Sequence, residues 1–183
     1  MKIGLILGSF DPLHIGHLAM ATEALNAGYV DRVEFIVAKQ NVWKINSTPY
    51  EIRLKLAEKA VEEIPGCFIS NVERDSSEPC FAYKGLEKIK KLYSNDELYI
   101  IGGSDMFASI DKWSHFDWIK ENFKFIGAIR DRQAFAVRVD ACIDPCINIS
   151  STKVRQLIRD NKIAQPWISL DLEDLIYKYG LYK

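Results

Sequence analysis

The chain has 183 residues and a formal net charge of −1 at pH 7, from 24 Lys+Arg against 25 Asp+Glu. A near-neutral chain has no overall positive field to attract a polyanion, so we expect no nucleic-acid partner and no membrane partner. The length suits one domain over residues 1–183. No apolar run is long enough for a membrane span or a signal sequence, which predicts a cytoplasmic protein.

Apolar runs rich in β-branched residues alternate with amphipathic stretches along the chain. Strands are predicted at residues 2–7, 33–37, 67–72, 98–101 and 123–129. Helices are predicted from about Pro12 to Gly28, over 50–64 and 81–93, after Ser150, and up to Gly180. This alternation predicts an α/β fold: a Rossmann-like doubly wound parallel sheet in a single domain, with a small C-terminal helical part from about residue 150. Residues 39–49 and 130–145 are predicted to be irregular, and ligands bind such sheets where loops leave the carboxyl ends of the strands.

The segment G-S-F-D-P-L-H-I-G-H, residues 8–17, follows the first predicted strand and opens the first predicted helix. Free N–H groups and the positive end of the helix dipole favour phosphate at such a position. Gly8 lets the backbone approach a ligand, and Gly16 removes a side chain between His14 and His17, which share one helical face. Two imidazole donors there suit negative charge that develops on a phosphoryl oxygen, so His14 and His17 are the candidate catalytic residues. The alternative interpretation is a pair of surface histidines or of metal ligands.

H-I-G-H also resembles a signature of class I aminoacyl-tRNA synthetases, but their K-M-S-K-S loop is absent from this sequence. The chain more closely resembles the nucleotidyltransferase superfamily, and within it the bacterial nicotinate (or nicotinamide) mononucleotide adenylyltransferases. Residues 8–17 look like the family's G-G-T-F-D-P-x-H-x-G-H, with Leu7 in place of the first glycine. Residues 149–155, I-S-S-T-K-V-R, look like its I-S-S-T-x-x-R, and residues 103–105 look like its G-x-D. The resemblance extends through nearly the whole chain.

The resemblance implies an ATP site built mainly from these three motifs. In it Asp105 would accept a hydrogen bond from a ribose hydroxyl, and the start of the helix after Ser150 would bind phosphates together with Arg155. Lys44 falls where the family places a phosphate-contacting lysine, although the family's prolines and histidine are missing from this loop. The implied ATP-binding residues are Gly8, Ser9, Phe10, Gly16, Lys44, Gly103, Asp105, Ile149, Ser150, Ser151, Thr152 and Arg155.

The resemblance also implies a mononucleotide site, in which Trp113 would stack on the pyridine ring. Its implied residues are Ser9, Phe10, Lys44, Phe81, Ala82, Trp113 and Arg130. Arg130 stands where the family has R-P-G, and residues 79–82 read P-C-F-A where nicotinate enzymes read P-S-Y-T. Because the threonine hydroxyl is lost, the sequence leaves the preference between nicotinate and nicotinamide open.

The implied reaction moves AMP from ATP to nicotinate mononucleotide (or nicotinamide mononucleotide), giving deamido-NAD (or NAD) and pyrophosphate in NAD biosynthesis. No carboxylate cluster suggests a metal cage, so Mg²⁺ is expected to arrive with ATP, and no protein metal ligands are predicted. The alternatives are pantetheine-phosphate adenylyltransferase or another H-x-G-H nucleotidyltransferase, and a nucleotide-binding sensor without catalysis. The sequence leaves open a homo-oligomer and gives no role to His115 or to the four cysteines.

Overall fold

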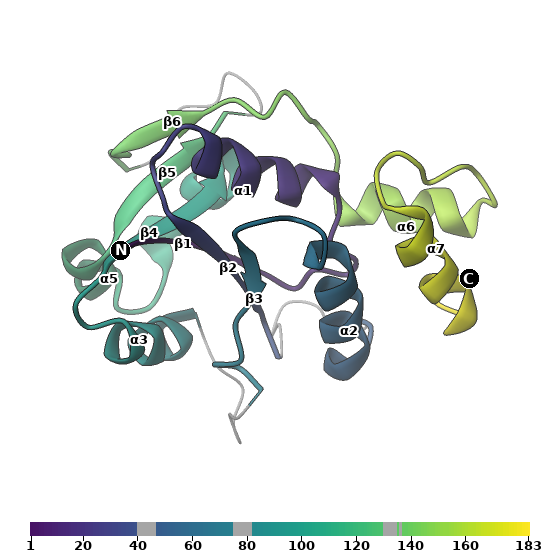
Figure 1. The fold of residues 1–183 in the computed structure, drawn as a ribbon, viewed down its shortest axis with the longest axis horizontal. Helices are drawn as coiled ribbons and strands as arrows, with labels where there is room; N and C mark the ends of the chain where they lie inside the picture. The colour runs from purple at the N-terminus through teal and green to yellow at the C-terminus, as the bar shows by residue number, and fades with distance from the viewer. Residues whose placement is uncertain (40–46, 75–81, 130–134, 136) are drawn as a thin grey trace.

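A computed structural model describes residues 1–39, 47–74, 82–129, 135 and 137–183. Its centre is a parallel sheet of six strands in the order β3-β2-β1-β4-β5-β6 (Figure 1). The strands are β1 (Lys2–Gly8), β2 (Arg32–Val37), β3 (Cys67–Ile69), β4 (Glu97–Gly103), β5 (Lys124–Ala128) and β6 (Ala141–Ile143). Strand order runs outward in both directions from the β1–β4 pair, so the predicted doubly wound α/β fold is confirmed and its switch point lies between these two strands.

Helices connect the first five strands of the chain, β1 to β5. They are α1 (Ile15–Asn26), α2 (Tyr50–Val61), α3 (Ala82–Leu92), α4 (Ser104–Phe107), the 3₁₀ turn η1 (Ile110–Lys112) and α5 (Phe116–Asn122), followed after the sheet by α6 (Ser151–Arg159) and α7 (Leu170–Lys178). No helix in the described part of the chain is both long and apolar enough to span a membrane.

Two predictions about local structure were wrong. The segment 130–145, expected to be irregular, contains the edge strand β6, and the third strand ends at Ile69 instead of residue 72. Both strands are three residues long at the sheet's edges, where pairing with a single neighbour, and not an alternating pattern, defines the strand. The turns α4, η1 and α5 were not predicted, because each is too short to show a helical period.

Each central strand is buried on both faces, which explains its continuous apolar sequence. Alternate residues of β4 point to opposite sides: Tyr99 and Ile101 join the cluster under α1 and α2, and Leu98 and Ile100 join the cluster under α3 and α5. The carboxyl ends of all six strands therefore lie along one edge of a rigid layer, where the connecting loops leave the sheet.

The C-terminal helices form a third cluster of their own against the outer side of α2 (Figure 1). Leu56 of α2 packs there with Val154, Ile158, Leu172 and Ile176. The predicted small C-terminal helical part is confirmed, and the packing brings the start of α6 back to the loop that follows β1.

Candidate active site

The loop after β1 begins with a tightly packed aromatic ring. Phe10 has a left-handed φ of 46° and is 2% exposed, with its ring edge-on to Phe35 and to His17 at centroid distances of 5.7 and 5.0 Å. A Cβ at Gly8 would lie 2.9 Å from Cε1 of Phe10. The missing side chain at Gly8 thus makes room for this ring, whereas the sequence suggested room for a ligand. The Phe10 side chain is part of the core, and only its main chain faces the loop.

His14 and His17 are brought together as predicted. Their rings stack with centroids 3.8 Å apart and planes inclined by 22°. His14 is 2% exposed and caps α1 in an extended conformation, and its backbone N–H donates to Nδ1 of His17 at 3.3 Å. Because Nδ1 of His17 accepts this bond, a neutral His17 ring carries its proton on Nε2.

Gly16 lets a second segment approach this pair. A Cβ at Gly16 would lie 2.9 Å from Cγ2 of Ile149 and 3.2 Å from Cε1 and Nδ1 of His14. Ile149 is buried and directly precedes the residue that caps α6. The absence of a side chain at Gly16 therefore permits the close packing of α1 against the start of α6.

The N-terminus of α6 is capped by Ser150 and tied to the loop by two side chains, those of Ser151 and Arg155. Ser150 accepts a hydrogen bond from the Lys153 N–H at 3.2 Å and caps the helix, and Ser151 Oγ donates to the Pro12 carbonyl at 2.9 Å. Arg155 donates to the Asp11 carbonyl at 2.8 Å and to Thr152 Oγ1 at 3.2 Å. The beginnings of α1 and α6, each the positive end of a helix dipole, are thus linked through one short loop.

Asp11, which the sequence analysis did not select, is the junction of this loop. Its side chain is 5% exposed; Oδ1 accepts from the Tyr182 hydroxyl at 2.7 Å and Oδ2 from the Thr48 N–H at 3.2 Å. Burial, together with the negative charge of Asp11, raises the pKa of Tyr182. No local pattern could have revealed the pair, since its members are 171 positions apart.

Arg53 was also missed, because it lies within a predicted helix and resembles an ordinary surface arginine there. It is 1% exposed, and among the described residues its guanidinium donates to four main-chain carbonyls: Ser9 at 2.6 Å, Thr48 at 2.8 Å, Ala38 at 2.9 Å and Lys39 at 3.1 Å. Burial lowers its pKa and the nearby Asp11 carboxylate opposes that shift. Arg53 therefore joins the loops that leave β1 and β2.

The predicted ribose and pyridine residues follow β4, the strand next to β1. Gly103 caps α4, and Asp105 lies exposed in the first turn of that helix. Trp113 directly follows η1 and is half-buried against the core under α3. Ala82 begins α3, and its neighbour Tyr83 stacks on the ring of His115 at 4.0 Å.

Three predicted site residues, Lys44, Phe81 and Arg130, lie outside the described residues. Within the described ranges no group of three or more His, Cys, Asp or Glu side chains is placed to hold a metal ion.

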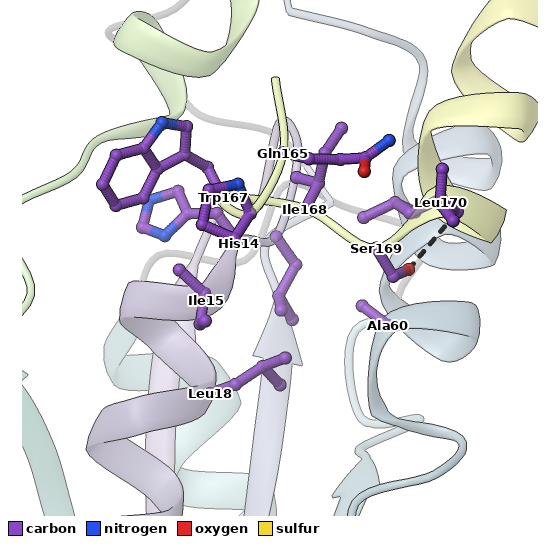
Figure 2. Close-up of a pocket in the computed structure, with 12 residues that line it drawn as sticks. His14, Ile15, Leu18, Ala60, Gln165, Trp167, Ile168, Ser169 and Leu170 are labelled. Carbon is purple, nitrogen blue, oxygen red and sulfur yellow. Dashed lines mark hydrogen bonds between the residues drawn. The ribbon is translucent and has the colours of Figure 1, made fainter. Parts of the chain in front are cut away.

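An apolar pocket of about 350 Å³, which the sequence did not predict, is lined in part by His14 (Figure 2). It is bordered by Ile15 and Leu18 of α1, Ala60 of α2 and the connection 165–170 between α6 and α7. The Ile15 N–H donates to the Trp167 carbonyl at 2.8 Å and fixes this connection to the start of α1. Of the histidine pair, His14 lines this pocket, and the lining is mostly apolar.

Two linked helix N-termini beside paired imidazoles, at the switch point of a doubly wound parallel sheet, define a nucleotide-binding α/β protein. The model of the cytidylyltransferase-like family matches residues 5–157, and the chain belongs to this family.

Similar proteins agree with the resemblance noted in the sequence. A protein of Thermus thermophilus named "Probable nicotinate-nucleotide adenylyltransferase" is 32% identical over 186 residues, covering 100% of both chains. A protein of Bacteroides thetaiotaomicron with the same name is 31% identical, covering 98% of this chain and 92% of its own. The structure of nicotinic acid mononucleotide adenylyltransferase from Plasmodium falciparum complexed with NaAD superposes with a TM-score of 0.83 at 21% identity, covering 99% of this chain and 97% of that one. The predicted family resemblance is confirmed.

Proposed function

We propose that this chain transfers AMP from ATP to nicotinate mononucleotide, with nicotinamide mononucleotide as the alternative acceptor, and releases pyrophosphate. The observation that carries the proposal is the stacked pair His14–His17, joined to the N-terminus of α6 through Ser151 and Arg155. The names of the full-length relatives support the same reaction. The product with nicotinate mononucleotide is deamido-NAD, and with nicotinamide mononucleotide it is NAD.

In this reaction a 5′-phosphate oxygen of the mononucleotide attacks the α-phosphorus of ATP. The new P–O bond forms as the bond between the α-phosphorus and the α,β-bridging oxygen breaks, and pyrophosphate leaves with the electron pair. No protein nucleophile takes part, so catalysis consists of alignment and stabilisation of charge. His17 Nε2–H would donate to an α-phosphate oxygen, and His14 would act beside it, where charge increases in the transition state.

The β- and γ-phosphates would bind at the start of α6. Backbone N–H groups of Ser151 and Thr152, the hydroxyl groups of this turn and the guanidinium of Arg155 supply donors there. Lys44 is proposed as a further phosphate contact. Mg²⁺ bound to the ATP phosphates would offset the charge of the leaving pyrophosphate.

The mononucleotide and the ribose would bind across the ends of β1 and β4. Trp113 would stack on the pyridine ring, Asp105 would accept from a ribose hydroxyl, and the Ser9–Phe10 main chain would border the reacting phosphates. Ala82 has no hydroxyl to recognise the nicotinate carboxylate, but it begins α3, whose first N–H groups favour an anion. Phe81 and Arg130 complete the proposed contacts.

The reaction is tested by incubating the protein with ATP and Mg²⁺ and, in parallel, nicotinate mononucleotide, nicotinamide mononucleotide or phosphopantetheine, with products identified by mass. We expect adenylylation of a pyridine mononucleotide. Adenylylation of phosphopantetheine alone would instead support the pantetheine-phosphate enzyme. Binding of ATP without pyrophosphate release from any mixture would support a sensor.

His17→Ala tests the proposed catalytic role. Removal of a single donor to a developing oxyanion costs about 2.7–4 kcal/mol of transition-state stabilisation, or about 10²–10³ in kcat. The matched control is His115→Ala, which removes the exposed histidine stacked on Tyr83 and should retain turnover. Wild-type turnover of His17→Ala in a pyrophosphate-release assay would refute the assignment.

A further inference from the structure

Three distant parts of the chain meet at Asp11. Its two carboxylate oxygens accept from the Tyr182 hydroxyl and the Thr48 N–H, and its main-chain carbonyl accepts from Arg155 at 2.8 Å. The Asp11 side chain is 5% exposed, so these contacts replace water around the carboxylate. The Asp11 carboxylate is thus bonded to Thr48 and Tyr182, whereas Arg155 is bonded to the Asp11 main-chain carbonyl.

The chain after α7 is folded to deliver the Tyr182 hydroxyl to this place. The Leu181 N–H donates to the Ile176 carbonyl at 3.0 Å and the Gly180 N–H to the Tyr177 carbonyl at 3.0 Å, which turns the chain back on the helix. Tyr182 itself has a φ of 62°, an uncommon conformation for a residue with a Cβ. Its contact with Asp11, 2.7 Å long and formed by a hydroxyl whose pKa is raised, keeps a neutral donor against the carboxylate.

An Asp11 carboxylate released from Tyr182 would compete with phosphate for Arg155. The guanidinium of Arg155 already contacts the main-chain carbonyl of Asp11, so the side chain of this same residue, once released from Tyr182, would be free to turn toward the arginine. A bidentate pair between the two would occupy the donors that an ATP phosphate needs, and the released negative charge would repel that phosphate.

We propose that Tyr182 is a positioning residue of the phosphate site: its hydroxyl holds the Asp11 carboxylate away from Arg155, which leaves Arg155 available to the ATP phosphates. The proposal rests on the proposed function for its choice of ATP as ligand. The segment that follows α7 is thereby assigned to the ATP site, although it lies far from the H-I-G-H and I-S-S-T motifs in sequence.

Tyr182→Phe removes the hydroxyl and leaves the ring. We expect the KM for ATP to rise about tenfold, as for loss of one charge-assisted hydrogen bond, while the KM for the mononucleotide stays near its wild-type value. Tyr179→Phe, at the same end of α7 and 38% exposed, is the matched control and should change neither constant.

A double-variant cycle separates this role from a structural one. Asp11→Asn removes the charge that competes for Arg155, so adding Tyr182→Phe to it should leave the KM for ATP unchanged. A Tyr182→Phe protein that melts at a lower temperature with a wild-type KM for ATP would show that the contact only stabilises the fold, and would overturn the proposal. An equal rise of that KM in both backgrounds would overturn it as well.

Direct binding of ATP keeps the two proposals distinguishable. Equilibrium dialysis of each variant with Mg²⁺ and ATP should give the same tenfold weakening for Tyr182→Phe, whether or not an acceptor is adenylylated. If the wild-type protein adenylylates no acceptor but Tyr182→Phe still weakens ATP binding, the proposed reaction fails and the positioning role stands. Equal ATP affinities of wild type and Tyr182→Phe would refute the positioning role alone.

Discussion

Substitution of Arg53 by methionine should loosen the carboxyl edge of the sheet. Arg53 is 1% exposed, and its guanidinium donates to four main-chain carbonyls. Ser9 follows β1, Ala38 and Lys39 follow β2, and Thr48 precedes α2. Methionine has a stem of similar bulk but no N–H group. The substitution therefore leaves four carbonyls without the donor that joins them.

The expected loss can be worked out from these contacts. A buried acceptor left without a partner costs about 1–3 kcal/mol, and Arg53 is a donor to four carbonyls. Water that reaches these carbonyls lowers the cost, and removal of the buried guanidinium lowers it further, because its desolvation penalty disappears. We expect Arg53→Met to lower the free energy of unfolding by about 3–5 kcal/mol, a large part of the 5–15 kcal/mol of a typical domain. Arg53→Lys keeps the charge but loses the planar guanidinium, so its free energy of unfolding should lie between those of the wild type and Arg53→Met.

Urea unfolding followed by far-UV circular dichroism gives the free energy of unfolding from the midpoint and slope. The matched control is Arg74→Met, because Arg74 is 43% exposed and its side chain pairs with Glu58, itself 46% exposed. Such a surface pair contributes about 0–1 kcal/mol. If Arg53→Met lost no more stability than Arg74→Met, the interpretation of Arg53 as the residue that joins the loops would be wrong.

Three further predictions concern the N-caps of α6 and α7, the side chain of Trp113, and the dependence of stability on pH. Ser150→Ala removes the N-cap acceptor of the Lys153 N–H, and Ser169→Ala removes that of the Leu172 N–H. Each should cost about 1 kcal/mol of stability, but only Ser150→Ala should raise the KM for ATP. If both variants had the same KM for ATP, the start of α6 would not belong to the phosphate site. Trp113→Ala should raise the KM for the mononucleotide and leave that for ATP unchanged, whereas an equal loss of both would identify Trp113 as a core residue. Burial and the hydrogen bond to Glu34 raise the pKa of Tyr93 from 10.0 to about 12, so its contribution to stability is present below pH 10 and is lost as the pH rises toward 12. Urea midpoints between pH 8 and about 12 should fall on the alkaline side in the wild type and fall less in Tyr93→Phe, and parallel curves would contradict the assignment.

The sequence could predict those elements and site residues whose signals are local. Strands buried on both faces produce continuous apolar runs, and the short spacing of His14 and His17 brings their rings into a stack. The sequence predicted that both residues share one helical face, whereas His14 is the extended N-cap of α1 and His17 lies within the helix. The capping hydroxyl of Ser150 is likewise visible in the residues around it. The motifs also show that α1 and α6 both begin at the site.

Contacts between distant segments could not be predicted. Arg53 is one cation of an amphipathic helix in sequence, and only the fold shows that its acceptors are four carbonyls of other segments. Asp11 and Tyr182 show no pattern that joins them. Gly8 was interpreted as a place where the backbone approaches a ligand, and only the fold shows that the Phe10 ring lies beside it.

The first and last residues of the chain lie toward opposite ends of the strands of the parallel sheet. The Met1 amino group pairs with Asp96 Oδ1 at 2.6 Å where β1 and β4 begin, and this exposed pair contributes little stability. Tyr182, by contrast, contacts Asp11 at the edge where the strands end. A purification tag, fluorophore or surface linker placed before Met1 is therefore remote from the histidine pair, whereas the same addition after Lys183 begins one residue from the hydroxyl that orients Asp11.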